Sequence, residues 1–227
     1  MQTSPSANAG LLAQTLRESL AAQADAARAA AMTAYMRGQF AFFGVPTPLR
    51  RSLTRSWISG AAPSLALDVA EILWRSEERE CQYAACDLLV RHARALPLHS
   101  AERLAALVCT KSWWDTVDPL ASNVFGPLAL RDVSVLAAID GYVNHEQMWL
   151  RRVAVLHQLQ YKAATDLARL QAALDANLAH PDFFIRKAMG WALRQYARTD
   201  PEWVRIYLRS RGDRVPALTR REAVKHL

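Results

Sequence analysis

Segments of helical length, separated by short turns, follow one another from about Leu11 to the C-terminus and leave little room for any other element. Gly and Pro residues mark connections such as 44–48, 60–63 and 180–182. No convincing run alternates apolar and polar residues as a half-buried strand does. The sequence therefore predicts an all-α fold, with helices at 11–31, 33–39, 48–59, 65–76, 78–94, 100–109, 117–129, 132–142, 146–161, 165–178, 182–198, 201–210 and 217–226.

Two of these segments resemble each other, which narrows the architecture. Residues 144–154 and 180–190 each hold a polar turn, an aromatic residue, an aliphatic residue and two basic residues, followed by small or apolar ones. Their dibasic pairs lie 35 residues apart, a spacing typical of a helical-hairpin repeat, and residues 78–85 form a weaker third copy. We expect a curved superhelical solenoid of stacked antiparallel helical pairs, with a concave binding face.

Composition limits the class of protein. With 227 residues, 52% of them hydrophobic, the chain is long enough for one substantial core. We expect a flexible tail at 1–10 and a single domain at 11–227. The three cysteines lack a CxxC pair and a His cluster, which indicates reduced, mostly buried thiols rather than a metal site. No secretory signal and no stretch of about 20 apolar residues is evident, so we expect a cytoplasmic protein without a membrane span.

Positive charge is concentrated near the C-terminus. Residues 186–227 hold eleven Lys and Arg against four Asp and Glu, a surplus as large as the net charge of +7 on the whole chain. A basic region on an otherwise neutral body suggests a surface that faces a polyanion. The alternative is that these side chains only solvate outer helix faces.

The segment from Lys111 to Pro119 places two tryptophans beside two carboxylates, Asp115 and Asp118. Consecutive side chains on a helix point about 100° apart, so one ring can pack inward while the other faces a carboxylate. An exposed ring beside an acid suits a bound cation. The pattern leaves a second interpretation open, in which Asp115 or Thr116 caps a helix and both rings are core.

Basic and aromatic residues also share one face of the helix expected at 182–198. Lys187, Trp191, Arg194 and Arg198 are spaced by four, three and four residues, opposite an apolar stripe. Such a face suits nucleic acid, because the basic side chains can bind phosphates while the ring packs on a sugar or a nucleobase. The alternative is a tryptophan covered by arginine stems.

The helix expected at 146–161 adds further candidates. Arg151 and Arg152 follow Trp149, and we expect Arg152 at the edge of the buried face, where it can reach a partner. Lys162, at the end of the same helix, is a further candidate. A basic residue at a helix C-terminus is also explained by its favourable interaction with the helix dipole alone.

Four motifs, at residues 113–118, 149–152, 158–162 and 184–194, together resemble the DNA alkylation repair glycosylases of the AlkD type, which are built from HEAT-like (ARM-type) repeats. Residues 35–40, followed by 43–45 and 47–48, are similar to that family's N-terminal signature. The resemblance runs from about residue 30 to about 210, and the Ala-rich segment before it carries no matching motif.

The resemblance implies hydrolysis of the N-glycosidic bond of N3- or N7-alkylated purines in duplex DNA, by a monofunctional enzyme that needs no metal, no cofactor and no obligate protein partner. Asp118 matches the catalytic aspartate, Trp114 and Trp191 the cleft tryptophans, and Arg152 the cleft arginine. Tyr35 matches a tyrosine that faces DNA. The remaining candidate DNA contacts are Arg151, Lys162, Lys187, Arg194 and Arg198. Gln160 departs from the family pattern, which often has a basic residue there, so one contact with the DNA backbone is in doubt.

These roles suit the chemistry. An alkylpurine is already cationic and leaves without an acid, while the sugar becomes an oxocarbenium-like cation. Asp118 can stabilise that cation and orient a water molecule. The resemblance further implies a shallow cleft that contacts backbone and sugar, whereas most glycosylases extrude the base into a deep pocket.

Two other functions remain open on the sequence. One is a HEAT-like module that binds DNA without excising a base. The other is a protein-interaction scaffold, the commonest role of helical repeats. The carboxylate Asp118 beside phosphate-binding residues argues against the first, and the basic C-terminal region argues against the second.

Overall fold

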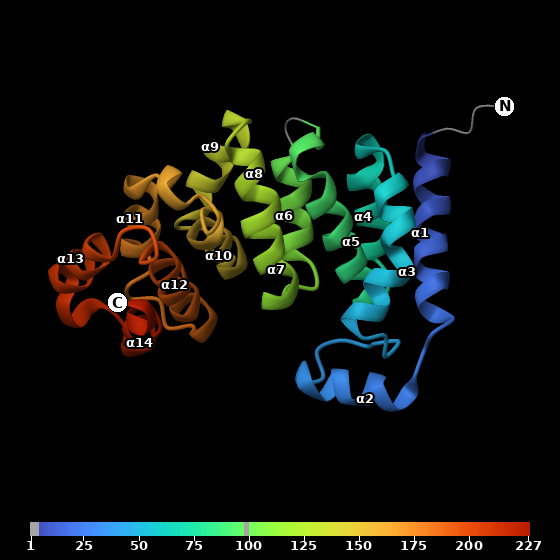
Figure 1. Ribbon diagram of the computed structural model, residues 1–227, viewed down its shortest axis with the longest axis horizontal. Coiled ribbons are helices and arrows are strands. Elements are labelled where there is room, and N and C mark those ends of the chain that lie inside the picture. Colours follow the sequence, from blue (N-terminus) through green and yellow to red (C-terminus); the bar gives the residue numbers. More distant parts are fainter. Residues whose placement is uncertain (1–4, 98–99) are drawn as a thin grey trace. The chain divides into compact units, whose positions relative to one another are not determined.

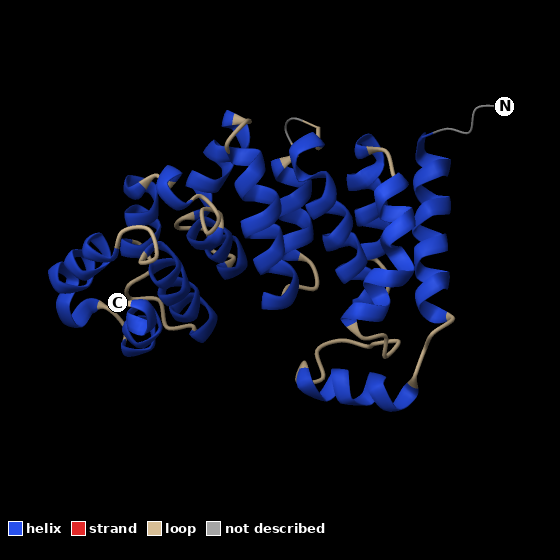
Figure 2. Cartoon of the chain, viewed as in Figure 1, coloured by secondary structure: helices blue, strands red, loops and turns tan. Residues whose placement is uncertain are grey.

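The computed structural model describes residues 5–97 and 100–227, and within them every regular element is a helix (Figure 2). An isolated parallel bridge between Ala41 and Glu78 is the only β-type pairing found in that part of the chain. The all-α prediction is therefore confirmed. None of the described helices is both long and apolar enough to cross a membrane.

The chain divides into two compact units, residues 1–97 and 98–227. Where the sequence predicted one domain, each unit has its own set of packed helices (Figure 1). The first contains α1 (Pro5–Ala21), α2 (Ala26–Tyr35), α3 (Thr47–Gly60), α4 (Ala66–Trp74) and α5 (Arg79–His92). The second contains α6 (Ala101–Cys109), α7 (Trp114–Leu120), α8 (Gly126–Ala129), α9 (Val133–Tyr142), α10 (Met148–Leu156), α11 (Leu167–Asp175), α12 (Phe183–Tyr196), α13 (Pro201–Arg211) and α14 (Ala217–Ala223).

In the first unit, α1 and α3–α5 pack around leucines such as Leu16, Leu67 and Leu88, which are fully buried. Helix α2 differs, because it contains no buried residue and projects from the other helices of the unit (Figure 1). Its alanines favour helix without supplying a large apolar face.

The N-terminal helix boundaries differ from those expected. Residues 5–10 already belong to α1, so the predicted tail is wrong there, and residues 1–4 lie outside the described part of the chain. The expected helix 11–31 is interrupted after Ala21. Asp25 caps α2 by accepting a bond from the Arg28 N–H, and its own N–H donates to the Phe43 carbonyl at 2.8 Å. No Gly or Pro marks this break, because a contact with a distant segment creates it.

A buried carboxylate holds the segment that carries the N-terminal signature. Glu80 on α5 accepts bonds from the backbone N–H groups of Phe43, Gly44 and Val45, at 2.8–3.0 Å. Gly44 has φ +90°, and a side chain there would overlap the Asp25 carbonyl. The signature therefore marks the place where the connection from α2 docks on α5.

In the second unit, α7 and α8 are joined by a π-helical segment, Ala121–Phe125, so the chain stays helical from Trp114 to Ala129. The predicted start at 117 is three residues late. Pro119 lies inside α7 and supplies no N–H, which weakens the regular pattern at this point. π-Helical turns of this kind are frequent at functional sites.

The predicted internal repeat is confirmed by matching hydrogen bonds. The Arg151 guanidinium donates to the His145 carbonyl at 2.6 Å, and the Arg186 guanidinium donates to the His180 carbonyl at 2.8 Å. Each histidine Nδ1 also accepts a bond from the N–H two residues later. The same turn thus leads into α10 and α12, 35 residues apart.

The crossing of α12 and α14 requires a glycine. A Cβ atom at Gly190 would lie 2.5 Å from the Glu222 Cβ and 2.8 Å from the Thr219 carbonyl oxygen. Gly190→Ala should therefore lower the free energy of unfolding by about 1–3 kcal/mol. Gly141→Ala, in α9 with no atom near its added Cβ, should stabilise the chain by up to about 1 kcal/mol. Urea titrations measure both, and equal effects would contradict the close crossing.

Burial of His157 should make the free energy of unfolding depend on pH. Its ring is buried at the end of α10, where Nδ1 contacts the Ala154 carbonyl at 2.9 Å, and burial lowers its pKa to about 4. The unfolded histidine binds a proton below about pH 6.5, so the stabilisation is fully present above 6.5 and is lost as the pH falls to about 4. The loss should reach about 3 kcal/mol. Denaturant titrations of His157→Phe should show a shallower decline over this window, and a decline as steep as that of the parent would contradict the assignment.

Candidate functional site

Asp118 and Arg152 form a two-pronged ion pair between α7 and α10. Arg152 donates from Nε to Oδ1 at 2.6 Å and from Nη2 to Oδ2 at 2.8 Å. Its third nitrogen, Nη1, donates to the Phe184 carbonyl at the start of α12. The side chains are 13% exposed for Asp118 and 4% for Arg152, so the pair is nearly dry. It fastens three helices at one point.

The structure corrects the expected position of Arg152. The sequence placed it at the edge of the buried face, within reach of a partner, whereas its side chain lies in the interior and all three of its nitrogens donate inside the protein. A guanidinium in this setting fixes the carboxylate that it binds and has little freedom to follow a phosphate.

Two opposing effects act on the Asp118 carboxyl. Burial raises its pKa above the ordinary aspartate value, and the nearby Asp115 raises it further, while the hydrogen bonds and charge of Arg152 oppose that rise. Arg152 therefore opposes the protonation of a carboxyl group whose burial favours the neutral acid.

The two adjacent tryptophans have different surroundings. Trp113 packs with the rings of Phe184, at 4.9 Å between centroids, and Trp149, at 6.0 Å. Trp114 begins α7 and is partly exposed, four residues before Asp118 and therefore on the same helical face. Trp113, itself partly exposed, therefore packs against two other rings, and the orientation of Trp114 toward a carboxylate stays a prediction.

Neither Asp115 nor Thr116 caps α7, so that part of the alternative interpretation is wrong. The N-cap is Trp113, in an extended conformation, and it makes no side-chain capping bond. Asp115 lies in the first turn, where a negative charge interacts favourably with the helix dipole. One turn later, the Ser122 hydroxyl donates to the Asp118 carbonyl at 2.9 Å, at the start of the π-helical segment.

The basic face of α12 is occupied by a carboxylate that the sequence did not single out. Glu222 on α14 accepts bonds from Lys187 at 2.6 Å and from Arg194 at 2.9 Å. Trp191 lies between these two residues along the helix and is partly exposed. Lys187 and Arg194 therefore contact α14, which packs beside them, and both side chains also meet solvent. In the sequence, the only indication that Glu222 forms ion pairs was its spacing of three residues from Lys225.

Arg151 also bonds to other groups of the protein, although its side chain is partly exposed. Besides the His145 carbonyl, it donates to the Asn144 carbonyl at 3.1 Å and to the side-chain oxygen of the buried Asn177 at 3.2 Å. Its guanidinium therefore braces the turn before α10 against the end of α11, and a DNA contact by Arg151 is not evident in this arrangement.

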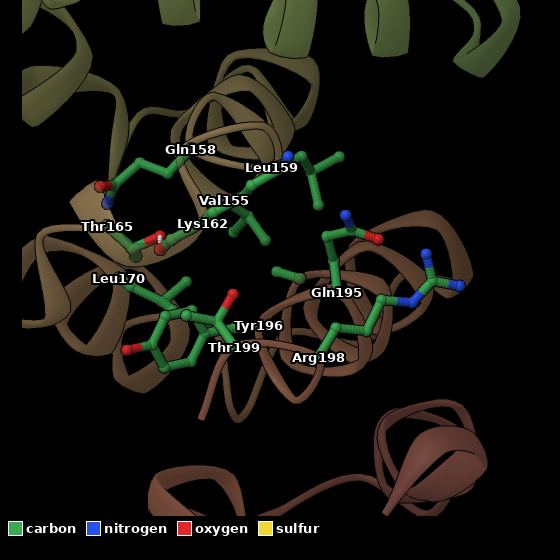
Figure 3. Close-up of a pocket in the computed structure, with 11 residues that line it drawn as sticks. Val155, Gln158, Leu159, Lys162, Thr165, Leu170, Gln195, Tyr196, Arg198 and Thr199 are labelled. Carbon is green, nitrogen blue, oxygen red and sulfur yellow. Dashed lines mark hydrogen bonds between the residues drawn. The ribbon is translucent and has the colours of Figure 1, made fainter. Parts of the chain in front are cut away.

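Lys162 and Arg198 line a different part of the second unit. They lie beyond the C-terminal ends of α10 and α12, on the border of a pocket of about 230 Å³. Its apolar wall includes Val155, Leu159 and Leu170, and the Arg198 guanidinium extends away from its centre (Figure 3). The residues that line this pocket include neither Asp118 nor Arg152.

Tyr35 belongs to the first unit. It is the last residue of α2, and its side chain is exposed, as a residue that meets a partner would be. Among the described residues, no three His, Cys, Asp or Glu side chains are grouped as metal ligands would be.

Comparisons with known proteins agree with this architecture. Residues 16–227 match the family model described as DNA alkylation repair enzyme. A solved structure titled "Predicted DNA alkylation repair enzyme from Enterococcus faecalis" is 33% identical in sequence and superposes with a TM-score of 0.83, covering 90% of this chain and 97% of its own. No curated protein matches significantly. The solved structure supports the helical-repeat fold, and the family model covers nearly all of the chain, which therefore belongs to the DNA alkylation repair enzyme family.

Proposed function

We propose that this protein is a monofunctional DNA glycosylase of base excision repair, which hydrolyses the N-glycosidic bond of cationic N3- or N7-alkylated purines in duplex DNA. The observation that carries the proposal is the Asp118 carboxylate, held by Arg152 on the helix face that also bears Trp114. Family membership supports DNA as the partner. Such a substrate places the activity in the cytoplasm, at the nucleoid.

Asp118 supplies the negative charge that the reaction needs. When the bond to an alkylpurine breaks, the neutral base departs and positive charge develops on the deoxyribose. A carboxylate oxygen has two lone pairs, and Arg152 takes one from each oxygen. The remaining lone pairs can accept a proton from the attacking water and face the sugar cation. Because the carboxylate is already fixed, little reorganisation is needed during the reaction.

Arg152 acts in this mechanism as a positioning residue. It sets the direction of both carboxylate oxygens and lowers the cost of keeping them charged in a nearly dry site. The contact with a partner that the sequence suggested for Arg152 has no part in this mechanism, because all three of its nitrogens already donate within the protein.

Trp114 and Trp191 bind the cationic nucleotide through their ring faces, each worth on the order of 0.5–2 kcal/mol. Partial exposure of both side chains supports this role. The proposal does not require an extruded base, since charge on the lesion supplies the selectivity. The pocket beside Lys162 and Arg198 has no part in it.

Binding of DNA without excision is the second candidate function. It is favoured by the same ion pair, because a carboxylate bonded through both oxygens to arginine also serves purely as a fastener between helices. Release of a free base separates the two candidates.

Asp118→Asn should abolish release of 7-methylguanine from methylated duplex DNA, measured chromatographically with enzyme in excess, and leave DNA binding intact. The loss of charge also leaves Arg152 unpaired, so stability should fall by about 3–5 kcal/mol. The assay is therefore run at a temperature where circular dichroism shows the variant folded. Asp115→Asn, which removes the other carboxylate of α7, is the control and should retain activity. Normal release by Asp118→Asn would refute the catalytic assignment.

Arg152→Gln should move the acid limb of the pH–rate profile to higher pH. The substitution removes the two effects that lower the pKa of Asp118 and leaves burial, which raises it. Arg152→Lys keeps the charge but loses the two-pronged geometry. Its acid limb should lie between that of Arg152→Gln and that of the parent protein. The measurement is single-turnover base release from pH 4 to 8. If both variants keep the parental profile, Arg152 does not act through Asp118.

A further inference from the structure

One buried carboxylate gathers three cations from two separate parts of the second unit. Lys187 and Arg194 reach Glu222 from α12, and Lys225, in the turn that follows α14, donates to both Glu222 oxygens at 2.9 Å. The Glu222 side chain is 3% exposed, whereas Lys187, Arg194 and Lys225 are 40%, 25% and 47% exposed. The anion is therefore covered by cations that still meet solvent.

The charge of this cluster distinguishes it from the other ion pairs of the unit. Hydrogen bonds from the lysines hold the pKa of Glu222 at about 2, so the carboxylate is charged at neutral pH. Three cations around one anion leave a net charge of +2. Asp118 and Arg152 cancel each other, and Arg169, which is bonded to both Asp140 and Asp166, belongs to a cluster with net charge −1.

The cluster also keeps unused donors. Lys225 uses two of the three N–H groups of its ammonium on Glu222, Lys187 uses one of three, and Arg194 uses one of five. The shared carboxylate fixes the directions of these side chains, so less rotamer entropy is lost when they bind an anion.

The backbone beneath the cluster is fixed as well. Helix α14 approaches α12 closely at Gly190, and the Thr219 hydroxyl donates to the Arg186 carbonyl at 2.8 Å. Arg220 ties α14 to the preceding turn by donating to the Gly212 carbonyl at 2.6 Å. The cluster is thus a built feature and not a chance meeting of long side chains.

Its position relates it to the proposed lesion contact. Lys187 and Arg194 lie four residues before and three residues after Trp191, so all three share one face of α12. An anion bound by the cluster would lie beside the Trp191 ring, as a backbone phosphate lies beside its own nucleotide.

We propose that Lys187, Arg194 and Lys225, arranged around Glu222, form a subsite for a phosphodiester of the DNA strand whose nucleotide contacts Trp191. The inference rests on the proposed function in taking duplex DNA as the partner, and it adds Lys225 as a phosphate-binding residue and Glu222 as the residue that positions all three cations.

The test is the salt dependence of binding to an undamaged duplex, measured by fluorescence anisotropy with Lys225→Gln. Loss of one phosphate contact should reduce the slope of log K against log salt by about 1, and weaken binding about three- to tenfold near 0.1 M salt. Arg169→Gln is the matched control, since it removes a cation from a cluster of net negative charge on the same unit, and it should leave the slope unchanged. A parental slope in Lys225→Gln, or an equal change in both variants, would overturn the subsite.

Base release from methylated duplex, measured on the same variants with enzyme in saturating excess, separates this inference from the proposed function. A parent protein that binds DNA and shows the expected change in slope but releases no base would refute the glycosylase and leave the subsite standing. A parent protein that releases base while Lys225→Gln keeps the parental slope would refute the subsite alone.

Discussion

The Asp118–Arg152 ion pair joins α7, α10 and the first turn of α12, and the candidate site is built around it. Burying a charge without a partner is costly, so each partner requires the other, and both require the Phe184 carbonyl that takes the third donor. Phe184 has a second role, because its ring supports Trp113 immediately before α7. One residue of α12 thus contacts both the arginine that holds the carboxylate and the ring that precedes α7.

Buried carboxylates serve as organising points in both units. Glu80 collects three backbone N–H groups from the connection after α2, Asp118 takes the guanidinium of α10, and Glu222 takes three cations from α12 and the C-terminal turn. The first fixes a loop, the second joins three helices at the candidate site, and the third gathers cations that still meet solvent. The partners that surround each carboxylate decide which of these results.

The sequence was most successful where local chemistry decides the structure. Helical periodicity and Gly or Pro turns predicted most helices to within a few residues, and the similarity of residues 144–154 and 180–190 predicted a repeat that recurs in the hydrogen bonds of His145 and His180. It failed at residues 22–25, where the helix is broken by the contact of Asp25 with Phe43. The resemblance of the chain to AlkD-type enzymes brought Asp118, Trp114, Arg152 and Trp191 together as candidates, but not their partners.

By itself, then, the sequence determined the helical class, the repeat, the family and the residue types available to a site, because these follow from spacing along one chain. Only the tertiary structure decided which charged side chains bond to other groups of the protein. Arg152 and Arg151 bond to other groups of the protein, Lys187 and Arg194 share Glu222, and Lys162 and Arg198 line a pocket. The physical reason is that a charge pairs with whatever lies within a few ångströms, and each of these four side chains has a partner more than 25 residues away in the chain.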